Sequence, residues 1–132
     1  MRVAIYGNLM STYEKNSILV GLKAKLLGEY DSEPDFSMYT DGVEPFLTND
    51  GRQSIRMEVY EIEKEKVIEL NRIKQYKGPE HTKTNLFNPK PINTPYGKGL
   101  IYLYNKDIKK LEKMKVSNWG NYEKYKQIKN ML

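Results

Sequence analysis

The segment Tyr6-Gly7-Asn8-Leu9 is the first place where residue types and order could support chemistry. It follows an apolar run, Val3 to Ile5, which predicts a short buried strand over residues 2–6 that ends in a turn. A glycine placed there lets the backbone turn sharply, so that N–H groups face outward and can hold a carboxylate or stabilise an oxyanion. The same pattern also fits a plain turn, so both interpretations stay open at this point.

The chain lacks the residues that several other kinds of chemistry need. The chain has no cysteine, which excludes a disulfide, a thiolate metal site and a cysteine nucleophile. The single histidine, His81, cannot build a zinc site without further ligands. It lies beside Glu80 and Lys83, so we expect it on the surface. No glycine-rich phosphate loop and no Gly-x-Ser-x-Gly motif occurs.

Short segments separated by turn residues predict most of the strands. Residues 54–62 alternate imperfectly between apolar and polar side chains, and Gly28 is placed to form a bulge. We expect turns at Asp41-Gly42 and at residues 49–51, and a loop over residues 89–97, which hold three prolines. Residues 17–22 fit either a helical turn or the lead into a strand. The predicted strands cover residues 2–6, 25–30, 36–40, 45–47, 54–62 and 100–104.

The clearest helix is predicted over residues 63–76. Val67, Leu70 and Ile73 form an apolar stripe, acidic residues occupy the first turn, and Gly78-Pro79 stops the helix. Two further helices are expected over residues 107–114 and 121–132. The order of elements predicts an α+β fold with a mostly antiparallel sheet.

Length and composition indicate one globular domain over residues 1–132. Apolar residues make up 39% of the chain and charged residues 30%, a balance typical of folded proteins. No apolar stretch is long enough for a signal peptide or a membrane span, so we expect a cytoplasmic protein without membrane contact. The many Lys, Asn and Tyr residues suggest an AT-rich genome, such as that of a phage or a low-GC bacterium.

The net charge of +5 lies in the basic, helical segment predicted over residues 105–132. That segment has eight Lys against three acidic residues, whereas residues 1–104 are neutral. A basic segment can bind nucleic acid, but it is more often a solvated face. It contains no Arg, which makes nucleic acid a less favoured partner.

Six segments repeat the motifs of one known family in its order. Residues 6–9 are similar to Tyr-Gly-Ser/Thr-Leu, and residues 70–76 are similar to Leu-Asp-x-x-Glu-Gly-Tyr. Residues 42–47 are similar to Gly-Tyr-Pro-Ala-Leu, and residues 57–62 to Gly-Glu-Val-Tyr-Glu-Val with Met57 in place of Gly. Residues 100–104 fit a late strand, and residues 117–122 are similar to Ser-Gly-Asp-Trp-x-x-Tyr. Across residues 2–122 the chain thus resembles the gamma-glutamylcyclotransferase-like (avirulence-induced-gene-like) family.

This resemblance implies a small mixed, mostly antiparallel, barrel-like sheet flanked by helices. It also implies conversion of gamma-glutamyl amines or peptides to 5-oxoproline, without a metal or cofactor. In that reaction the substrate's own amine attacks its gamma-carbonyl, and a pocket Glu must first take a proton from the amine. The amides of the Tyr-Gly loop hold the polar groups of the substrate.

At the position of that Glu, this chain has Lys74. A Lys is cationic at neutral pH and repels the ammonium that it would have to deprotonate, unless burial lowers its pKa by several units. Glu58, Glu69 and Glu80 are candidates for a relocated base. The resemblance carries the ligand-binding role to Tyr6, Gly7, Asn8, Leu9, Lys74, Tyr76, Trp119 and Tyr122; Trp119 and Tyr122 fit a core role as well.

Three functions follow as hypotheses. The first is a pseudoenzyme that has lost the cyclotransferase activity and binds an anionic or gamma-glutamyl-type small molecule, or an anionic partner, in the family pocket. The second is a diverged cyclotransferase whose base has moved to Glu58 or Glu80. The third is a nucleic-acid binder that uses the lysines of residues 105–132.

Overall fold

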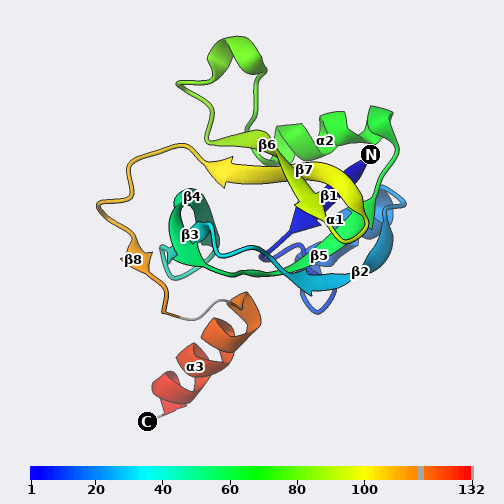
Figure 1. Ribbon diagram of the computed structural model, residues 1–132. Coiled ribbons are helices and arrows are strands. Elements are labelled where there is room, and N and C mark those ends of the chain that lie inside the picture. The colour runs from blue at the N-terminus through cyan, green and yellow to red at the C-terminus, as the bar shows by residue number, and fades with distance from the viewer. Residues whose placement is uncertain (116–117, 132) are drawn as a thin grey trace.

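The strands of the computed structural model, which describes residues 1–115 and 118–131, form two sheets (Figure 1). Among the described strands β1 and β7 alone pair in parallel, and every other pair is antiparallel. The predicted α+β class with a mostly antiparallel sheet is therefore confirmed. In spatial order the first sheet holds β2 (Lys25–Asp31), β5 (Arg56–Glu61), β1 (Arg2–Ile5), β7 (Gly97–Tyr104) and β6 (Phe87–Thr94). The second holds β4 (Pro45–Gln53), β3 (Phe36–Thr40) and β8 (Glu112–Lys113).

The helices lie around these sheets, with α2 above the strands and α3 below them in Figure 1. Val67 and Leu70 of the predicted stripe are buried, so the helix expected over residues 63–76 is confirmed in a shorter form. None of the described helices is long and apolar enough to cross a membrane. The α-helices are α1 (Ser17–Gly21), α2 (Val67–Ile73) and α3 (Trp119–Met131), and 3₁₀ turns cover η1 (Glu14–Asn16), η2 (Lys64–Lys66) and η3 (Pro79–His81).

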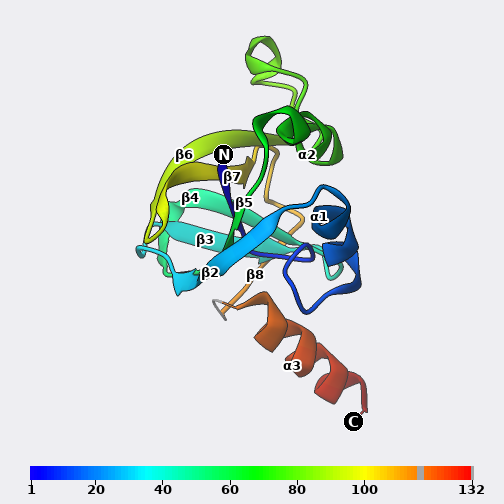
Figure 2. The ribbon, with the colours of Figure 1, turned by 90° about the vertical axis from the view of Figure 1, so that its right-hand side faces the viewer.

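Strand β1 runs through the middle of the core. It has β5 on one side and β7 on the other, and Val3, Ala4 and Ile5 are at most 4% exposed. In Figure 2 the strands of both sheets curve around this interior. Burial of apolar surface stabilises such a core by roughly 25 cal/mol per Å². The loop that follows β1 therefore starts from a buried strand that is paired on both sides.

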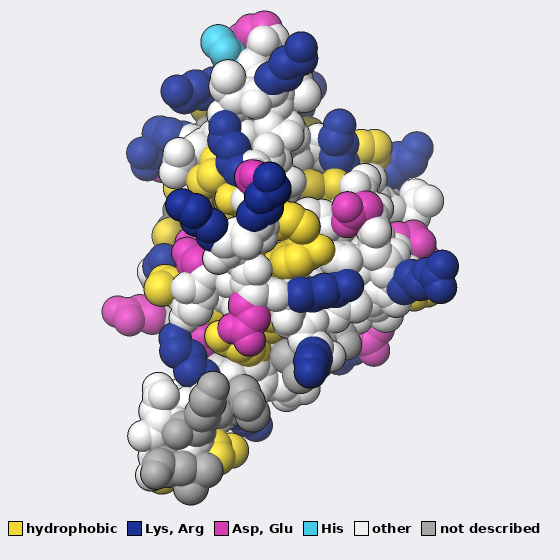
Figure 3. Space-filling model, turned by 90° about the vertical axis from the view of Figure 1, so that its left-hand side faces the viewer, with side chains coloured by type: hydrophobic (Ala, Val, Ile, Leu, Met, Phe, Trp, Pro, Cys, Tyr) yellow, Lys and Arg dark blue, Asp and Glu magenta, His cyan; other side chains and the backbone are white. Residues whose placement is uncertain are grey.

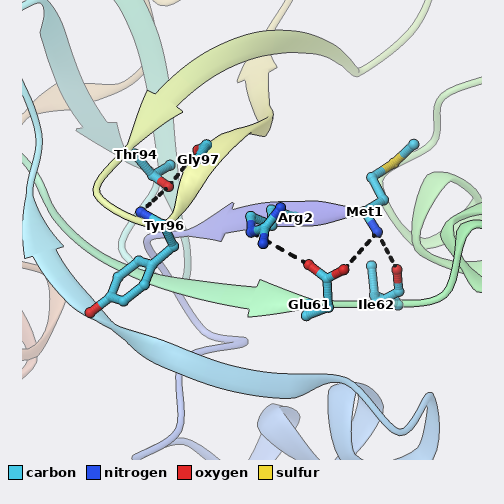
Figure 4. Close-up of polar contacts among 7 residues, drawn as sticks. All are labelled: Met1, Arg2, Glu61, Ile62, Thr94, Tyr96 and Gly97. Atoms are coloured by element: carbon cyan, nitrogen blue, oxygen red, sulfur yellow. Dashed lines mark hydrogen bonds and ion pairs between the residues drawn. The ribbon is translucent and has the colours of Figure 1, made fainter.

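Polar contacts fix the other end of β1 and the turn between β6 and β7 (Figure 4). The Met1 ammonium donates to the Ile62 carbonyl oxygen at 2.8 Å and to Glu61 at 3.3 Å. The Tyr96 side chain reaches across to β2, where a Cβ atom on Gly28 would lie 1.8 Å from its hydroxyl oxygen. The register of β2 shifts between Leu26 and Gly28, which confirms the predicted bulge.

The loop predicted over residues 89–97 is wrong, because most of it is strand β6. Pro89 pairs with Tyr102 and Pro91 with Leu100 in an antiparallel ladder with β7. Strand β6 lies at the edge of the sheet. Two prolines spaced by two residues can both turn their missing N–H positions to the open edge, so the ladder loses no hydrogen bond.

The helix predicted over residues 107–114 is also wrong. The segment turns at Asp107, whose carboxylate accepts the backbone N–H of Lys109, and then adds β8 to the edge of β3. Met114 is buried there, and its backbone N–H donates to the Met38 carbonyl oxygen at 2.8 Å. An unpaired strand edge outweighed a weak helical pattern, and among the described residues of the basic segment 105–132 the helix is α3.

The turn predicted at residues 49–51 does not separate two strands. Strand β4 continues to Gln53, with an irregularity where Phe36 pairs with Gln53 but Ser37 pairs with Thr48. A Cβ atom on Gly51 would lie 2.3 Å from the Phe36 carbonyl oxygen. Gly51 therefore serves a close approach of two backbones rather than a hairpin turn.

Candidate functional site

A cavity of about 260 Å³ opens where β1 ends. Its walls come from six parts of the chain: the end of β1 with the loop after it, η1 with the start of α1, the start of β4, the C-terminal end of α2, the start of β6, and β7. The volume lies just below the usual range of ligand pockets, ~300–1,000 Å³, so it suits a small metabolite. Its polar and charged lining residues are Tyr6, Asn8, Lys15, Glu44, Lys74, Gln75 and Tyr102.

The loop after β1 is a tight turn that leaves two amides free. The Met10 N–H closes it on the Gly7 carbonyl oxygen at 3.0 Å, and the backbone N–H groups of Asn8 and Leu9 donate to no described residue. A Cβ atom on Gly7 would lie 2.6 Å from Pro45, so glycine allows the loop to approach β4. Gly7, Asn8 and Leu9, to which the resemblance carries a ligand-binding role, all line the cavity.

Tyr6 forms part of the cavity wall as a neutral phenol. Its hydroxyl group donates to the Tyr102 carbonyl oxygen at 2.5 Å. The residue is 5% exposed, and this burial raises the pKa of Tyr6 far above its usual value. The phenol therefore contributes a rigid apolar ring rather than a charge.

Lys74 brings a cation into this cavity. Its Nζ atom lies 4.9 Å from the Phe87 ring centroid and 5.9 Å from that of Tyr6, and it forms no ion pair or hydrogen bond with any described residue. Burial lowers the pKa of Lys74 to about 8, the charge of Glu44 opposes this shift, and Lys15 adds to it. The amine is thus mainly protonated at neutral pH and lacks a partner of its own.

The end of α2 places this amine. The N–H of Gln75 donates to Arg72 and that of Tyr76 donates to Asn71, which is the paired bonding of a Schellman motif. Gln75 adopts a left-handed φ of 52°, at the position where the Leu-Asp-x-x-Glu-Gly-Tyr pattern has Gly. The helix therefore ends in the shape expected for that pattern, and Lys74 extends from its last turn into the cavity.

Glu44 and Lys15 are two charged lining residues that the sequence analysis missed. Glu44 is set by the turn before β4, where the Asp41 carboxylate accepts its backbone N–H at 3.0 Å. Thr40 also donates to its carbonyl oxygen at 2.9 Å. A signal for Glu44 was present, since it lies inside the matched segment 42–47 directly before Pro45. Lys15 had no comparable signal, because the polar stretch around it matched no motif.

Glu58, the first candidate for a relocated base, lies outside the cavity. Its carboxylate is buried and accepts three hydrogen bonds, from the Ser11 N–H at 2.6 Å, the Ser11 hydroxyl at 2.5 Å and the Tyr60 hydroxyl at 2.9 Å. Burial and the bond to Glu58 raise the pKa of Tyr60 to about 12. Glu58 thus holds the segment after the Tyr6–Leu9 loop in place.

The other two candidate acids are also away from the cavity. Glu69 pairs with Arg72 on the outer face of α2. Glu80 is exposed in η3, with a carboxylate oxygen 3.8 Å from His81, which is on the surface as expected. Neither Glu69 nor Glu80 lines the space around Lys74.

Three of the predicted ligand-binding residues do not line the cavity. Tyr76 follows the end of α2 on the outer side. Trp119 is fully buried, donates through Nε1 to the Asn8 side chain at 2.6 Å, and stacks on Tyr122 at 5.1 Å between ring centroids. Trp119 thus holds the Tyr6–Leu9 loop through the Asn8 side chain without lining the cavity itself. Ser117, which belongs to the matched segment 117–122, lies outside the described residues.

The chain is similar to known proteins both in sequence and in structure. The sequence model described as "Gamma-glutamyl cyclotransferase, AIG2-like" matches residues 3–123. The chain belongs to this family. It is also 30% identical over 125 residues to a gamma-glutamylcyclotransferase family protein, ytfP, of Citrobacter rodentium, and the match covers 95% of this chain and all of that protein.

Solved structures with the same fold agree with this membership. The solution structure of ytfP from Escherichia coli has a TM-score of 0.71 at 24% identity, covering 93% of this chain and 99% of that one. The crystal structure of an uncharacterised Pyrococcus horikoshii protein has a TM-score of 0.74 at 22% identity, covering 96% of both chains. At these identities the structures support the α+β fold of the gamma-glutamyl cyclotransferase family, and the fold alone.

Proposed function

We propose that this family member binds a small anionic molecule in the cavity and no longer carries out the cyclotransferase reaction. The observation behind the proposal is Lys74, a half-buried cation without an ionic partner among the described residues, which lines the same cavity as Asn8 and Leu9, whose backbone N–H groups donate to no described residue. A carboxylate entering the cavity could accept hydrogen bonds from these amides and neutralise the ammonium. Charge-assisted hydrogen bonds of this kind are about twice as strong as neutral ones.

The charges that line the cavity favour a single negative group on the ligand. Lys15 and Lys74 are positive and Glu44 is negative, which leaves one positive charge in excess. Glu44 would repel a second negative group placed on its side and would attract a positive one. A monocarboxylate, with or without an amino group, matches this arrangement.

The same charges argue against the family's reaction in its usual form. That reaction needs a base beside the ligand's ammonium group, and the amine of Lys74 is mainly protonated at pH 7. A cation at this position raises the free energy of a second cation nearby. The proposed loss of activity therefore follows from the sign of one charge.

Binding of small carboxylates at pH 7, measured by titration calorimetry or by NMR shifts, tests the anion site. Lys74→Met should lower the affinity at least tenfold, which corresponds to about 1.4 kcal/mol. Lys64→Met, on the exposed side of η2, is the matched control and should bind as the wild type does. Equal affinity of the wild type and Lys74→Met would contradict the proposal.

An assay for 5-oxoproline tests the loss of activity separately. Wild-type protein incubated with gamma-glutamyl amines should release none above the level without protein. Release at an enzymatic rate would overturn this part of the proposal while leaving the anion site possible.

A second candidate function is a diverged cyclotransferase with Glu44 as its base. The observation that favours it is the position of Glu44, which is the acidic residue among the cavity's lining residues. If the wild type releases 5-oxoproline, Glu44→Gln should abolish the release and Glu80→Gln should not. Full activity of Glu44→Gln would exclude this mechanism.

Nucleic-acid binding by residues 105–132 stays a prediction without further support. On the face shown in Figure 3, Lys and Arg side chains are interspersed with acidic and apolar ones. Two lysines of the segment also bond within the protein: Lys106 donates to the Thr84 carbonyl oxygen and Lys126 to that of Gly42.

A further inference from the structure

The amine of Lys74 has the surroundings of a nucleophile as well as those of a charge. Its Nζ atom lies over the Phe87 and Tyr6 rings, and Ile73 and Leu86 add apolar wall. No acceptor among the described residues bonds to it. A lysine amine without a hydrogen-bond partner, in an apolar and partly closed space, keeps its lone pair available whenever it loses its proton.

Loss of that proton is far easier here than on the surface. The burial that lowers the pKa of Lys74 to about 8 leaves about a tenth of the amine neutral at pH 7. An ordinary lysine, with a pKa of about 10.4, is neutral in fewer than about one molecule in a thousand at that pH. Lys74 should therefore react with electrophiles well before the exposed lysines do.

The charged and titratable groups that line the cavity affect the pKa of Lys74, but the buried phenols among them do not lose a proton in the same pH range. Glu44 favours the protonated amine and the exposed Lys15 favours the neutral one. Tyr6 and Tyr102 are phenols whose pKa values burial raises well above the usual value, so both stay neutral in the range where Lys74 titrates.

We propose that Lys74 forms an imine with the carbonyl group of a 2-oxo acid bound in this cavity. The inference rests on the proposed anion site, because the carboxylate of the 2-oxo acid would take the place of the anion. The amides of Asn8 and Leu9 and the charge of Lys15 remain to hold that carboxylate when Lys74 is neutral. The carbonyl carbon next to the carboxylate is then the electrophile beside the amine.

The step balances without an oxidant or a reductant. The nitrogen lone pair attacks the carbonyl carbon, a C–N bond forms as the C=O π bond breaks, and one of the two nitrogen protons passes to the carbonyl oxygen to give a carbinolamine. The nitrogen then loses its remaining proton, the hydroxyl group leaves as water, and a C=N bond remains. Glu44 lines the same cavity, and its carboxylate can accept the proton that the nitrogen loses and pass it to the leaving hydroxyl group. Amine and ketone thus give imine and water.

Reductive trapping tests this inference. Wild-type protein is incubated with pyruvate and cyanoborohydride, and the modified peptides are identified by mass spectrometry. The expected result is one carboxyethyl group on Lys74, with a trapping rate that follows the neutral amine, reaches half of its maximum near pH 8 and levels off above that pH. Lys74→Arg, which keeps the charge and lacks the primary amine, should lose the adduct. Lys64→Arg should keep it.

The outcomes separate this inference from the proposed function. Propionate has the charge of pyruvate without the ketone, so its binding reports the anion site alone. If propionate and pyruvate both bind and no adduct forms on Lys74, the imine is wrong and the anion site stands. If neither binds, the anion site and the inference both fail. Adducts spread over many lysines, or an unchanged yield in Lys74→Arg, would also overturn the imine.

Discussion

The side chain of Lys74 sits where its positive charge costs free energy. In the unfolded chain its pKa is that of an ordinary lysine, about 10.4, and in the folded protein burial lowers the pKa to about 8. Between these two values the unfolded state binds more protons than the folded state. The free energy of unfolding therefore receives from Lys74 a contribution that rises with pH across this window and is flat below pH 8.

This gives a prediction for Lys74→Met. The variant should be more stable than the wild type at pH 7 by about 2 kcal/mol, a value reduced from the full pKa shift because solvent still reaches the half-buried amine. The gain should shrink as the pH rises from 8 to 10. Urea unfolding at pH 7, 8, 9 and 10 measures it, with Lys64→Met as the control that changes little. A gain independent of pH would contradict the assigned cause.

Gln75 also carries a free-energy cost, which comes from its backbone conformation and which a glycine at this position would avoid. It holds a left-handed φ of 52° at the end of α2, a conformation that costs a residue with a Cβ atom roughly 1 kcal/mol relative to Gly. We predict that Gln75→Gly raises the free energy of unfolding by roughly that amount. Gln75→Ala keeps the Cβ atom and should show no gain. Equal stability of the two variants in thermal unfolding would rule out strain at this position.

Among the elements, the pairing of β4 with β3 depends strongly on a single glycine, Gly51. Gly51 lies against β3, and a Cβ atom there would be 1.9 Å from the Ser37 hydroxyl oxygen and 2.3 Å from a backbone oxygen of Phe36. Backbone cannot move aside as a flexible side chain can. The irregular pairing of β3 and β4 therefore needs a residue without a side chain at this point.

We predict that Gly51→Ala destabilises the protein by about 1–3 kcal/mol, the usual cost of overpacking. Gly21→Ala is the matched control, because a Cβ atom on Gly21 would meet nothing within 4 Å and alanine suits the end of α1. It should be neutral or slightly stabilising. Thermal unfolding of both variants compares them, and a loss of the same size in both would refute the steric explanation.

Over the whole molecule, the hydrogen bond between Trp119 and Asn8 joins α3 to the loop that carries the free amides. Trp119 is the single tryptophan of the chain and is fully buried. Asn8, which lines the cavity, thus uses its side chain to hold the C-terminal helix. A substitution of Asn8 should therefore alter the surroundings of Trp119 in α3.

We expect Asn8→Ala to leave the buried indole N–H without its partner, at a cost of about 1–3 kcal/mol. The emission of Trp119 should shift to longer wavelength as water gains access, and small carboxylates should bind more weakly. Asn121→Ala, at an exposed position of α3, is the control and should leave both readouts unchanged. An Asn8→Ala variant with wild-type emission and stability would show that the contact is not structural.

The sequence by itself determined the elements whose residues carry their own signals. The apolar run before Gly7, the stripe of α2, the strand at residues 36–40 and the Gly28 bulge were all predicted, because side-chain periodicity and backbone freedom are local properties. The family and its fold were predicted as well, from six short segments in one order. The same segments predicted a ligand-binding role for Gly7, Asn8, Leu9 and Lys74, which stays a prediction, and the structure places all four along one cavity.

Only the tertiary structure decided what depends on neighbours that are distant in the chain. An open sheet edge made Pro89 and Pro91 part of β6, and the edge of β3 took residues 112–113 into β8, against their local patterns. Folding also placed Glu44 and Lys15 in the cavity and Glu58 and Glu80 outside it. Above all it fixed the pKa of Lys74, because burial and the charges around a side chain are set by the packing of separate elements.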